Sequence, residues 1–218
     1  MGLRALGRLC GTHPERLTMT AFIYLASQSP RRSQLLSQLG VRHEVLLPEA
    51  SENVESLELV NGNEAPKRYV QRVTALKLEA ALARLQRRGL PLAPVLCSDT
   101  TVALGSTIYG KPENSADAKR MLKELSGHTH RVLTAVAIGD GQRSVSVCSV
   151  SSVRFAQLTA AQIATYVATE EPMGKAGAYA VQGRAAAFIA HISGSYSGIM
   201  GLPLFETVRA LKSLGFDV

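Results

Sequence analysis

The chain has 218 residues, which suits one domain or two small lobes around a shared core. Apolar residues make up 46% and charged residues 19%, so the composition excludes intrinsic disorder, and no apolar run approaches the ~18 residues of a membrane span. The net charge of +7 favours anionic partners such as nucleic acid, phosphate ligands or anionic lipid. The three cysteines are scattered, which argues against a disulfide framework or a structural zinc site and fits a cytoplasmic protein.

Residues 1–18 contain Arg4 and Arg8, but their apolar positions are interrupted too often for a signal peptide. Strong patterning begins only after Met19. We therefore expect residues 1–18 to be a disordered extension or the product of an upstream start, and residues 19–218 to form a single domain.

Short apolar runs predict strands, and apolar residues at helical spacing between capping residues predict helices. The first half of the chain reads, in order, as a strand at Phe22–Ala26, a helix from Ser29-Pro30 to Gly40, a strand at His43–Leu47, a polar loop at Ser51–Asn63, a helix at Glu64–Arg88 and a strand at Val95–Leu104.

The second half reads as a hairpin at Gly105–Gly110, a helix at Ser115–Leu125, strands at Thr129–Gly139 and Arg143–Phe155 joined by Asp140-Gly141, a helix at Thr159–Thr169, a glycine-rich loop at Gly174–Gly183, a strand at Ala186–Ile192 and a helix at Pro203–Leu214. Helices and strands intermix throughout and no internal repeat is present. The pattern predicts one α/β domain.

The segment Ser27-Gln28-Ser29-Pro30-Arg31-Arg32 joins a buried strand to a helix N-terminus, whose free N–H groups favour an anion. Arg31 and Arg32 add bidentate phosphate donors, and because they oppose the helix dipole, helix stability alone does not explain them. The alternative is a capped surface helix with two solvated arginines.

Asp99 interrupts an apolar strand, and a buried carboxylate needs a metal, a cation or a proton as compensation. It is a candidate metal ligand or general base, or else a strand-end carboxylate bonded to loop amides. Lys77 lies on the apolar side of its helix, where it either extends to solvent or reaches an anion. Glu52 lies in the polar loop and on its own reads as solvated.

The run from Gly105 to Lys111 matches the first part of a P-loop, but Pro112 stands where Ser or Thr is needed and the context is a hairpin. We reject that interpretation and keep Lys111 as a candidate phosphate ligand, because a Gly-Lys-Pro turn can aim its ammonium group. Gln182 offers a donor and an acceptor, which suits the edge of a base, although an ordinary turn is the alternative. The histidines show no metal-binding or catalytic spacing.

Taken together, these stretches resemble the Maf family of nucleoside triphosphate pyrophosphatases. The matching stretches, in family order across about residues 22–215, are Leu25 to Arg32, Ser98-Asp99-Thr100, Gly110-Lys111-Pro112, Glu171-Pro172 with Lys175 to Tyr179, Gln182-Gly183 and Gly201-Leu202-Pro203-Leu204. Gly198 departs from the family, in which asparagine is common at this position.

The resemblance implies an α/β fold with a mixed twisted sheet, flanking helices and two lobes around a central cleft, related to inosine triphosphate pyrophosphatase, with residues 19–218 as one Maf-like catalytic domain. It implies hydrolysis of a nucleoside triphosphate to the monophosphate and pyrophosphate with a divalent metal, Mg²⁺ or Mn²⁺. The family positions fall on Ser27, Arg31, Arg32, Lys77 and Lys111 for substrate binding, on Asp99 for catalysis, and on Glu52 and Asp99 for the metal. Whether Asp99 is the base or a metal ligand stays open at this point.

The residues Arg31, Thr100 and Gln182 resemble the branch of the family that acts on dTTP and UTP. This implies a nucleotide-pool sanitising enzyme, which we expect to be a cytoplasmic homodimer that binds neither membranes nor nucleic acid. The alternative is a non-enzymatic nucleotide-binding regulator of cell division, which the joint presence of Asp99, Lys111 and Lys175 argues against.

Overall fold

The computed structural model describes residues 22–49 and 52–218, so the predicted N-terminal extension at residues 1–18 lies outside the described residues. Its sheet has seven strands, with neighbours in the order β2-β1-β3-β5-β6-β7 and with β4 also paired to β3. The strands are β1 (Phe22–Leu25), β2 (Arg42–Val45), β3 (Val95–Leu104), β4 (Thr107–Tyr109), β5 (Thr129–Gly139), β6 (Ser144–Phe155) and β7 (Ile189–Ser193). β1 runs parallel to β2 and β3, and the other pairs are antiparallel.

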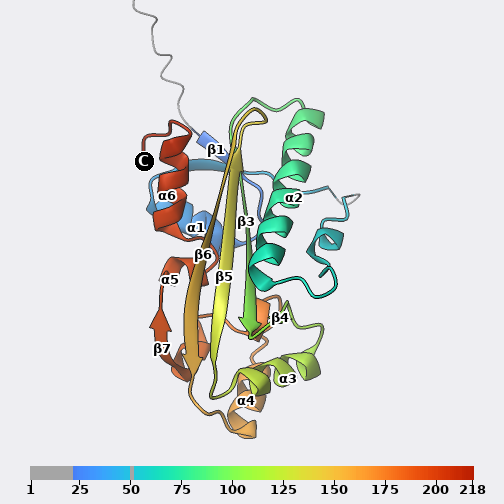
Figure 1. Cartoon of the computed structure of the whole chain (residues 1–218), viewed down its shortest axis with the longest axis vertical. Helices are drawn as coiled ribbons and strands as arrows, with labels where there is room; N and C mark the ends of the chain where they lie inside the picture. Colours follow the sequence, from blue (N-terminus) through green and yellow to red (C-terminus); the bar gives the residue numbers. More distant parts are fainter. Residues whose placement is uncertain (1–21, 50–51) are drawn as a thin grey trace, which may run out of the picture.

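The long strands β3, β5 and β6 pass through two halves of the molecule, and different helices surround each half (Figure 1). The helices are α1 (Pro30–Gln38), α2 (Pro66–Arg87), α3 (Ser115–Leu125), α4 (Ala160–Val167), α5 (Tyr196–Ile199) and α6 (Leu204–Ser213), with short 3₁₀ turns η1 (Glu55–Glu58), η2 (Ala176–Ala178) and η3 (Arg184–Phe188). α1, α2 and α6 lie around one half, and α3 and α4 lie in the other (Figure 1). Within residues 22–49 and 52–218, no helix is both long enough and apolar enough to cross a membrane.

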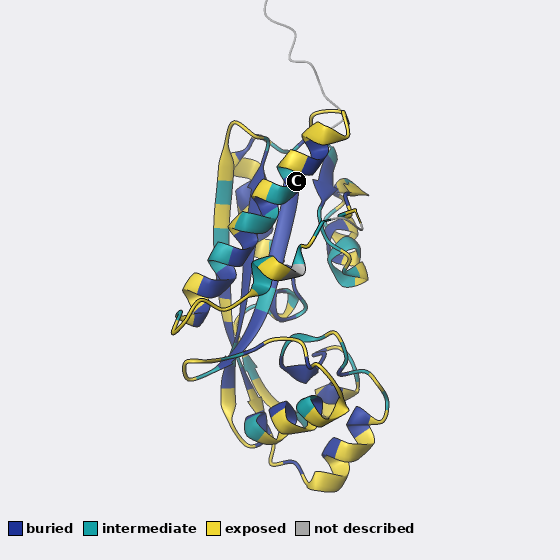
Figure 2. Cartoon of the chain, turned by 90° about the vertical axis from the view of Figure 1, so that its right-hand side faces the viewer, coloured by how far each residue is buried: buried dark blue, intermediate teal, exposed yellow. Residues whose placement is uncertain are grey.

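The alternation of side chains along the strands builds a core on each face of the sheet. In the first half, Leu96 and Ile138 pack with α1 and α6, whereas Cys97 and Ala137 pack with α2 on the opposite face. In the second half, a separate cluster that includes Phe155 joins the strands to α3 and α4. Figure 2 shows the buried central strands and the more exposed outer faces of the helices.

The structure confirms the mixed α/β fold and most of the predicted elements. The strand predicted at Ala186–Ile192 is wrong in its first part, because η3 occupies Arg184–Phe188 and β7 begins only at Ile189. Three consecutive alanines in η3 have little preference for a strand. The short helix α5, capped by the Ser195 side chain, was not predicted. Ser29 is the N-cap residue of α1, but its side chain makes no capping bond.

Candidate active site

A gap along one edge of β3 forms the floor of the site. β1 pairs with β3 only at Val95 and Leu96, and β4 pairs with it only from Val102 onward. Between these two pairings, Ser98 and Thr100 point toward the α1 and α6 side, where Ser98 donates to the Gly201 carbonyl at 2.9 Å. Asp99 points toward α2. Because side chains alternate along a strand, this one stretch supplies polar groups to both sides of the gap.

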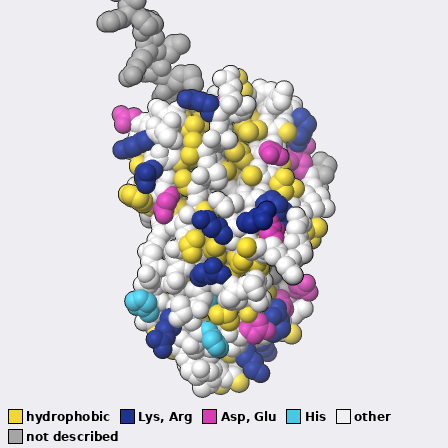
Figure 3. Space-filling view, viewed as in Figure 1, with side chains coloured by type: hydrophobic (Ala, Val, Ile, Leu, Met, Phe, Trp, Pro, Cys, Tyr) yellow, Lys and Arg dark blue, Asp and Glu magenta, His cyan; other side chains and the backbone are white. Residues whose placement is uncertain are grey.

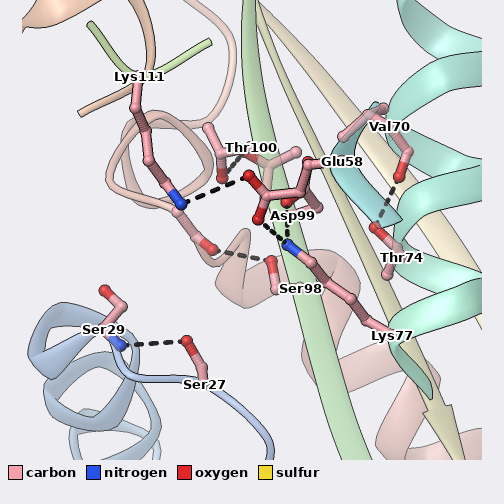
Figure 4. Close-up of polar contacts among 12 residues, drawn as sticks. Ser27, Ser29, Glu58, Val70, Thr74, Lys77, Ser98, Asp99, Thr100 and Lys111 are labelled. Atoms are coloured by element: carbon pink, nitrogen blue, oxygen red, sulfur yellow. Dashed lines mark hydrogen bonds and ion pairs between the residues drawn. The ribbon is translucent and has the colours of Figure 1, made fainter. Parts of the chain in front are cut away.

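Lys77 lies between two carboxylates at this floor (Figure 4). Its Nζ atom is 2.6 Å from Asp99 Oδ1 and 2.7 Å from Glu58 Oε1, and the other Glu58 oxygen is 3.4 Å from Lys111 Nζ. Burial alone would lower the pKa of Lys77, but the two carboxylates raise it above its usual value. Burial alone would raise the pKa of Glu58, but Lys77 and Lys111 lower it below its usual value. Basic and acidic side chains therefore alternate along this floor, each within ion-pair distance of the next.

The structure therefore resolves two alternatives of the sequence analysis. Lys77 reaches anions and does not extend to solvent. Asp99 is not a strand-end carboxylate bonded to loop amides, because it lies inside β3 and contacts an ammonium group. Lys111 follows a hairpin formed by β3 and β4, which agrees with the rejection of the P-loop interpretation.

The structure does not bring Glu52, the predicted metal ligand, to the cavity with Asp99. Glu52 is not among the residues that line the cavity. Its carboxylate makes a bidentate ion pair with Arg84, at 2.7 and 2.9 Å, and contacts Arg87 at 3.0 Å. Arg84 is buried, so the charge of Glu52 is compensated by an arginine and not by the groups around Asp99.

Glu58 is the carboxylate of this loop that lies at the cavity, beside Lys77 and Lys111. The Tyr69 hydroxyl donates to the Glu58 backbone carbonyl at 2.9 Å, which fixes η1 against α2. No pattern in the sequence marks Glu58, because the predicted loop contains several acidic residues and no periodicity that would show which one turns inward.

The Arg32 guanidinium group is held by three oxygen atoms. It donates to the Gly201 carbonyl at 2.8 Å, to Ser27 Oγ at 3.0 Å and to Thr100 Oγ1 at 3.3 Å. Ser27 Oγ also accepts the Ser29 backbone N–H at 3.2 Å, so Ser27 organises the start of α1. The predicted substrate residues Ser27 and Arg32 thus form one rigid unit with the predicted specificity residue Thr100.

Thr100 also begins a chain of hydroxyl groups. Thr134 donates to the Gly198 carbonyl at 2.7 Å and lies 2.9 Å from Thr100, so the Thr100 hydroxyl donates to Thr134 while it accepts from Arg32. Gly198 contributes to the local turn by donating its N–H to Ser195 Oγ at 3.0 Å.

Arg31 and Lys175, like Arg32, line the cavity and make no ion pair with any described residue. Burial lowers the pKa of Lys175, Arg31 lowers it further, and Glu171 partly offsets both effects. Two neighbouring cations without a carboxylate partner favour binding of a polyanion. The sequence placed Lys175 only in a family stretch and assigned it no role, whereas the structure places it in the cavity wall.

The loop that carries Gln182 packs directly on the floor of the site. Gly177 donates its N–H to the Gly110 carbonyl at 3.0 Å, next to Lys111, and it has φ of 68°. A Cβ atom at Gly177 would lie 2.8–2.9 Å from the Val102 side chain on β3. Only glycine combines this positive φ with so close an approach. The exposed side chain of Gln182 lines the same cavity as Asp99 and Lys111.

These groups line one cavity of about 530 Å³. Its walls include Ser27, Arg31, Arg32, Glu58, Lys77, Asp99, Thr100, Lys111, Lys175 and Gln182. On the face shown in Figure 3, Lys and Arg side chains gather at mid-height with an acidic side chain among them. The volume is in the range typical of small-molecule sites, and the lining suits a phosphate-bearing ligand.

A divalent metal fits this cavity only in the company of a substrate. Among the described residues, no group of three or more His, Cys, Asp and Glu side chains could hold a metal ion. Glu58 and Asp99 supply two hard oxygen donors beside one ammonium group. One or two carboxylates completed by substrate phosphates are a common binding mode for Mg²⁺.

The comparisons with known proteins agree with this geometry. The family described as Maf-like protein matches residues 22–214. The protein named dTTP/UTP pyrophosphatase from Albidiferax ferrireducens is 68% identical over 92% of this chain and 100% of its own length. Proteins of the same name from Polaromonas and from Cupriavidus pinatubonensis are 64% and 59% identical, over 90% and 89% of this chain and 98% and 97% of their own lengths.

A solved structure, that of the Staphylococcus aureus Ham1 protein, matches at a TM-score of 0.38 and 12% identity, over 61% of this chain and 71% of that chain. The family match covers the sheet, its helices and the residues that line the cavity, so the chain belongs to the Maf family.

Proposed function

We propose that this chain is a nucleoside triphosphate pyrophosphatase that hydrolyses dTTP and UTP between the α- and β-phosphates. The observation that carries the proposal is Lys77, held between Glu58 and Asp99 at the floor of the cavity. The same cavity is lined by Arg31, Arg32 and Lys175, which make no ion pair with a described carboxylate. The names of the relatives support the choice of dTTP and UTP.

In the proposed reaction, Arg31, Arg32, Lys111 and Lys175 bind the triphosphate and stabilise the charge that develops on the leaving pyrophosphate. Lys77 orients Asp99, whose second carboxylate oxygen has no hydrogen bond to a described residue. That oxygen is placed to orient a water molecule or to take its proton. Mg²⁺ or Mn²⁺, bound by Glu58, Asp99 and the phosphates, would supply charge neutralisation at the reacting phosphate.

The base would lie against Gln182, whose amide can match the alternating carbonyl and N–H groups of a pyrimidine. The free thiols Cys97 and Cys148 agree with a cytoplasmic location, which we also propose. Homodimer formation stays a prediction.

The test is to incubate the full chain with each common nucleoside triphosphate and Mg²⁺ in ¹⁸O-labelled water. The proposal expects dTTP and UTP to be the best substrates, with pyrophosphate released and the label in the monophosphate. Release of inorganic phosphate with a diphosphate product would contradict it. Binding without turnover would favour the non-enzymatic regulator.

A matched pair of variants sharpens this test. Glu58→Gln and Glu52→Gln make the same chemical change in two carboxylates of one loop, of which only Glu58 lines the cavity. We expect the first to lose most turnover and the second to keep it at 25 °C. Equal losses would argue against the role of Glu58.

A further inference from the structure

Glu171 lies outside the cavity wall but is bound to two elements that flank the cavity. Its Oε1 atom accepts a hydrogen bond from the Tyr166 hydroxyl at 3.0 Å, and its Oε2 atom accepts the backbone N–H of Arg184 at 3.0 Å. Its own N–H donates to Thr169 Oγ1 at 3.3 Å. One carboxylate therefore connects α4 to the start of η3.

The carboxylate also packs against the turn that carries Gln182. A Cβ atom at Gly183 would lie 2.2 Å from Glu171 Oε1, so the carboxylate occupies the space that any side chain would need there. Gly183 donates its N–H to the Ala180 carbonyl at 3.0 Å, which closes a tight turn around Gln182. The backbone on the C-terminal side of Gln182 is thus fixed by Glu171.

Gln182 has no anchor of its own. Its exposed side chain makes no hydrogen bond within residues 22–49 and 52–218, and it lines the cavity. Its position therefore depends on the backbone that presents it. Tyr166, at the other end of the contact, is buried in the core of the second half, on a helix that a capping box begins at Thr159.

We infer that Glu171 is a positioning residue for base discrimination: by holding the turn at Gly183 and Arg184, it aims the Gln182 amide at the base. The inference rests on the proposed function. The inference divides the site into a part that recognises the base and a part that binds the phosphates. The residues proposed to bind phosphate are fixed by other contacts, such as those of Arg32 with Gly201 and Ser27.

The test compares Glu171→Gln and Tyr166→Phe with the control Glu170→Gln. Glu170 is the adjacent residue, is exposed and makes no side-chain hydrogen bond to a described residue, so the control removes the same charge without touching the turn. Tyr166→Phe removes one bond but keeps the charge that faces Lys175.

The first readout is the ratio of kcat/KM for UTP to that for CTP. Loss of one or two hydrogen bonds changes such a ratio by roughly 5- to 50-fold, and we expect a fall of this size in Glu171→Gln, a smaller fall in Tyr166→Phe and none in Glu170→Gln. The fall should come from a higher KM for UTP, with kcat changed by less than about 3-fold.

The second readout is inhibition by inorganic tripolyphosphate, which carries no base. We expect the inhibition constant of tripolyphosphate for Tyr166→Phe to stay within about 3-fold of the wild-type value. The reason is that tripolyphosphate would contact only the phosphate-binding cations. An unchanged UTP-to-CTP ratio in Glu171→Gln would overturn the inference. Equal weakening of UTP, CTP and tripolyphosphate, together with a lower Tm, would also overturn it and assign Glu171 a structural role.

The inference can fail separately from the proposed function. If the wild-type chain does not hydrolyse UTP, calorimetric binding of UMP and CMP to the same variants replaces the kinetic ratio. Loss of the preference for UMP over CMP in Glu171→Gln would then support the positioning role, and an unchanged preference would refute it.

Discussion

Asp99 lies in the middle of β3 with one carboxylate oxygen bound to Lys77, which leaves the other oxygen for water or a cation. Asp99→Asn keeps the shape of the side chain but removes its charge. We expect the fold to be kept and turnover to fall by ~10²–10⁴-fold, the usual effect of removing a general base. Pyrophosphate release, measured beside Tm, checks both expectations.

Calorimetric binding of dTTP to Asp99→Asn, with and without Mg²⁺, separates the two roles of this residue. Retention of more than about a tenth of wild-type turnover would exclude Asp99 as the base. Loss of turnover together with loss of the Mg²⁺-dependent part of binding would identify a metal ligand, with Glu58 as the next candidate for the base.

Gln182 presents an amide to the cavity, and Gln182→Glu replaces its donor with an acceptor. We expect kcat/KM for dTTP and UTP to fall by ~10- to 100-fold, with the preference moving toward purine nucleotides. Gln142→Glu, in the exposed hairpin between β5 and β6, is the matched control. Relative rates that stay the same for all bases would show that Gln182 does not contact the base.

Glu52 has a stabilising role through Arg84. Hydrogen bonds from Arg84 lower the pKa of Glu52 to about 2, well below its usual value. Glu52→Gln should lower the free energy of unfolding at pH 7 by about 1–3 kcal/mol, because it removes a charge-assisted pair with a buried arginine. Chemical denaturation of the variant beside wild type measures this difference.

The same pair predicts a pH dependence with a definite sign. The folded-state pKa of Glu52 is depressed, so its stabilisation is fully present above the unfolded pKa of about 4.5 and is lost as the pH falls toward about 2. The difference in unfolding free energy between wild type and Glu52→Gln should therefore shrink between these two pH values. A constant difference across this range would contradict the assignment.

The packing of η2 on β3 is the contact between elements that closes the site. Gly177→Ala would place a methyl group against Val102 at a residue with positive φ, and should lower the free energy of unfolding by about 2–4 kcal/mol. Gly174→Ala, at a similar φ of 70° but with nothing within 4 Å, should cost only about 1 kcal/mol. Urea denaturation of both variants tests the difference.

Because Gly177 also donates to the Gly110 carbonyl, Gly177→Ala should raise the KM for the nucleotide through displacement of Lys111. Gly174→Ala serves as the control for a change in loop flexibility. Equal effects of the two substitutions on stability and on KM would show that the contact with Val102 has no particular importance.

For the whole molecule, we predict that residues 1–18 are dispensable. The family match begins at residue 22. The full length of the relative from Albidiferax ferrireducens aligns with 92% of this chain. A chain that starts at Met19 should have a free energy of unfolding within about 0.5 kcal/mol of that of the full chain, and it should keep its turnover. A loss of several kcal/mol would show that the segment packs on the core.

The sequence was sufficient for those features that depend on neighbouring residues. Apolar periodicity, capping residues and the Asp-Gly dipeptide predicted most helices and strands, and the buried strand around Asp99 predicted a carboxylate in need of a partner. The position of Lys77 on the apolar side of α2 left two alternatives, solvent or an anion, and the contacts with Glu58 and Asp99 decide for the anion. These patterns are local, because they follow from the repeat of a helix or a strand.

The tertiary structure alone decided which partners these groups have. Glu52 and Glu58 lie in one polar loop, and the choice between them depends on Arg84 and Lys77, which come from different turns of α2. The contact of Glu171 with Gly183 likewise depends on how the loop folds back on α4. A loop without periodicity carries no sign of which carboxylate faces inward, because that is set by contacts between residues far apart in the chain.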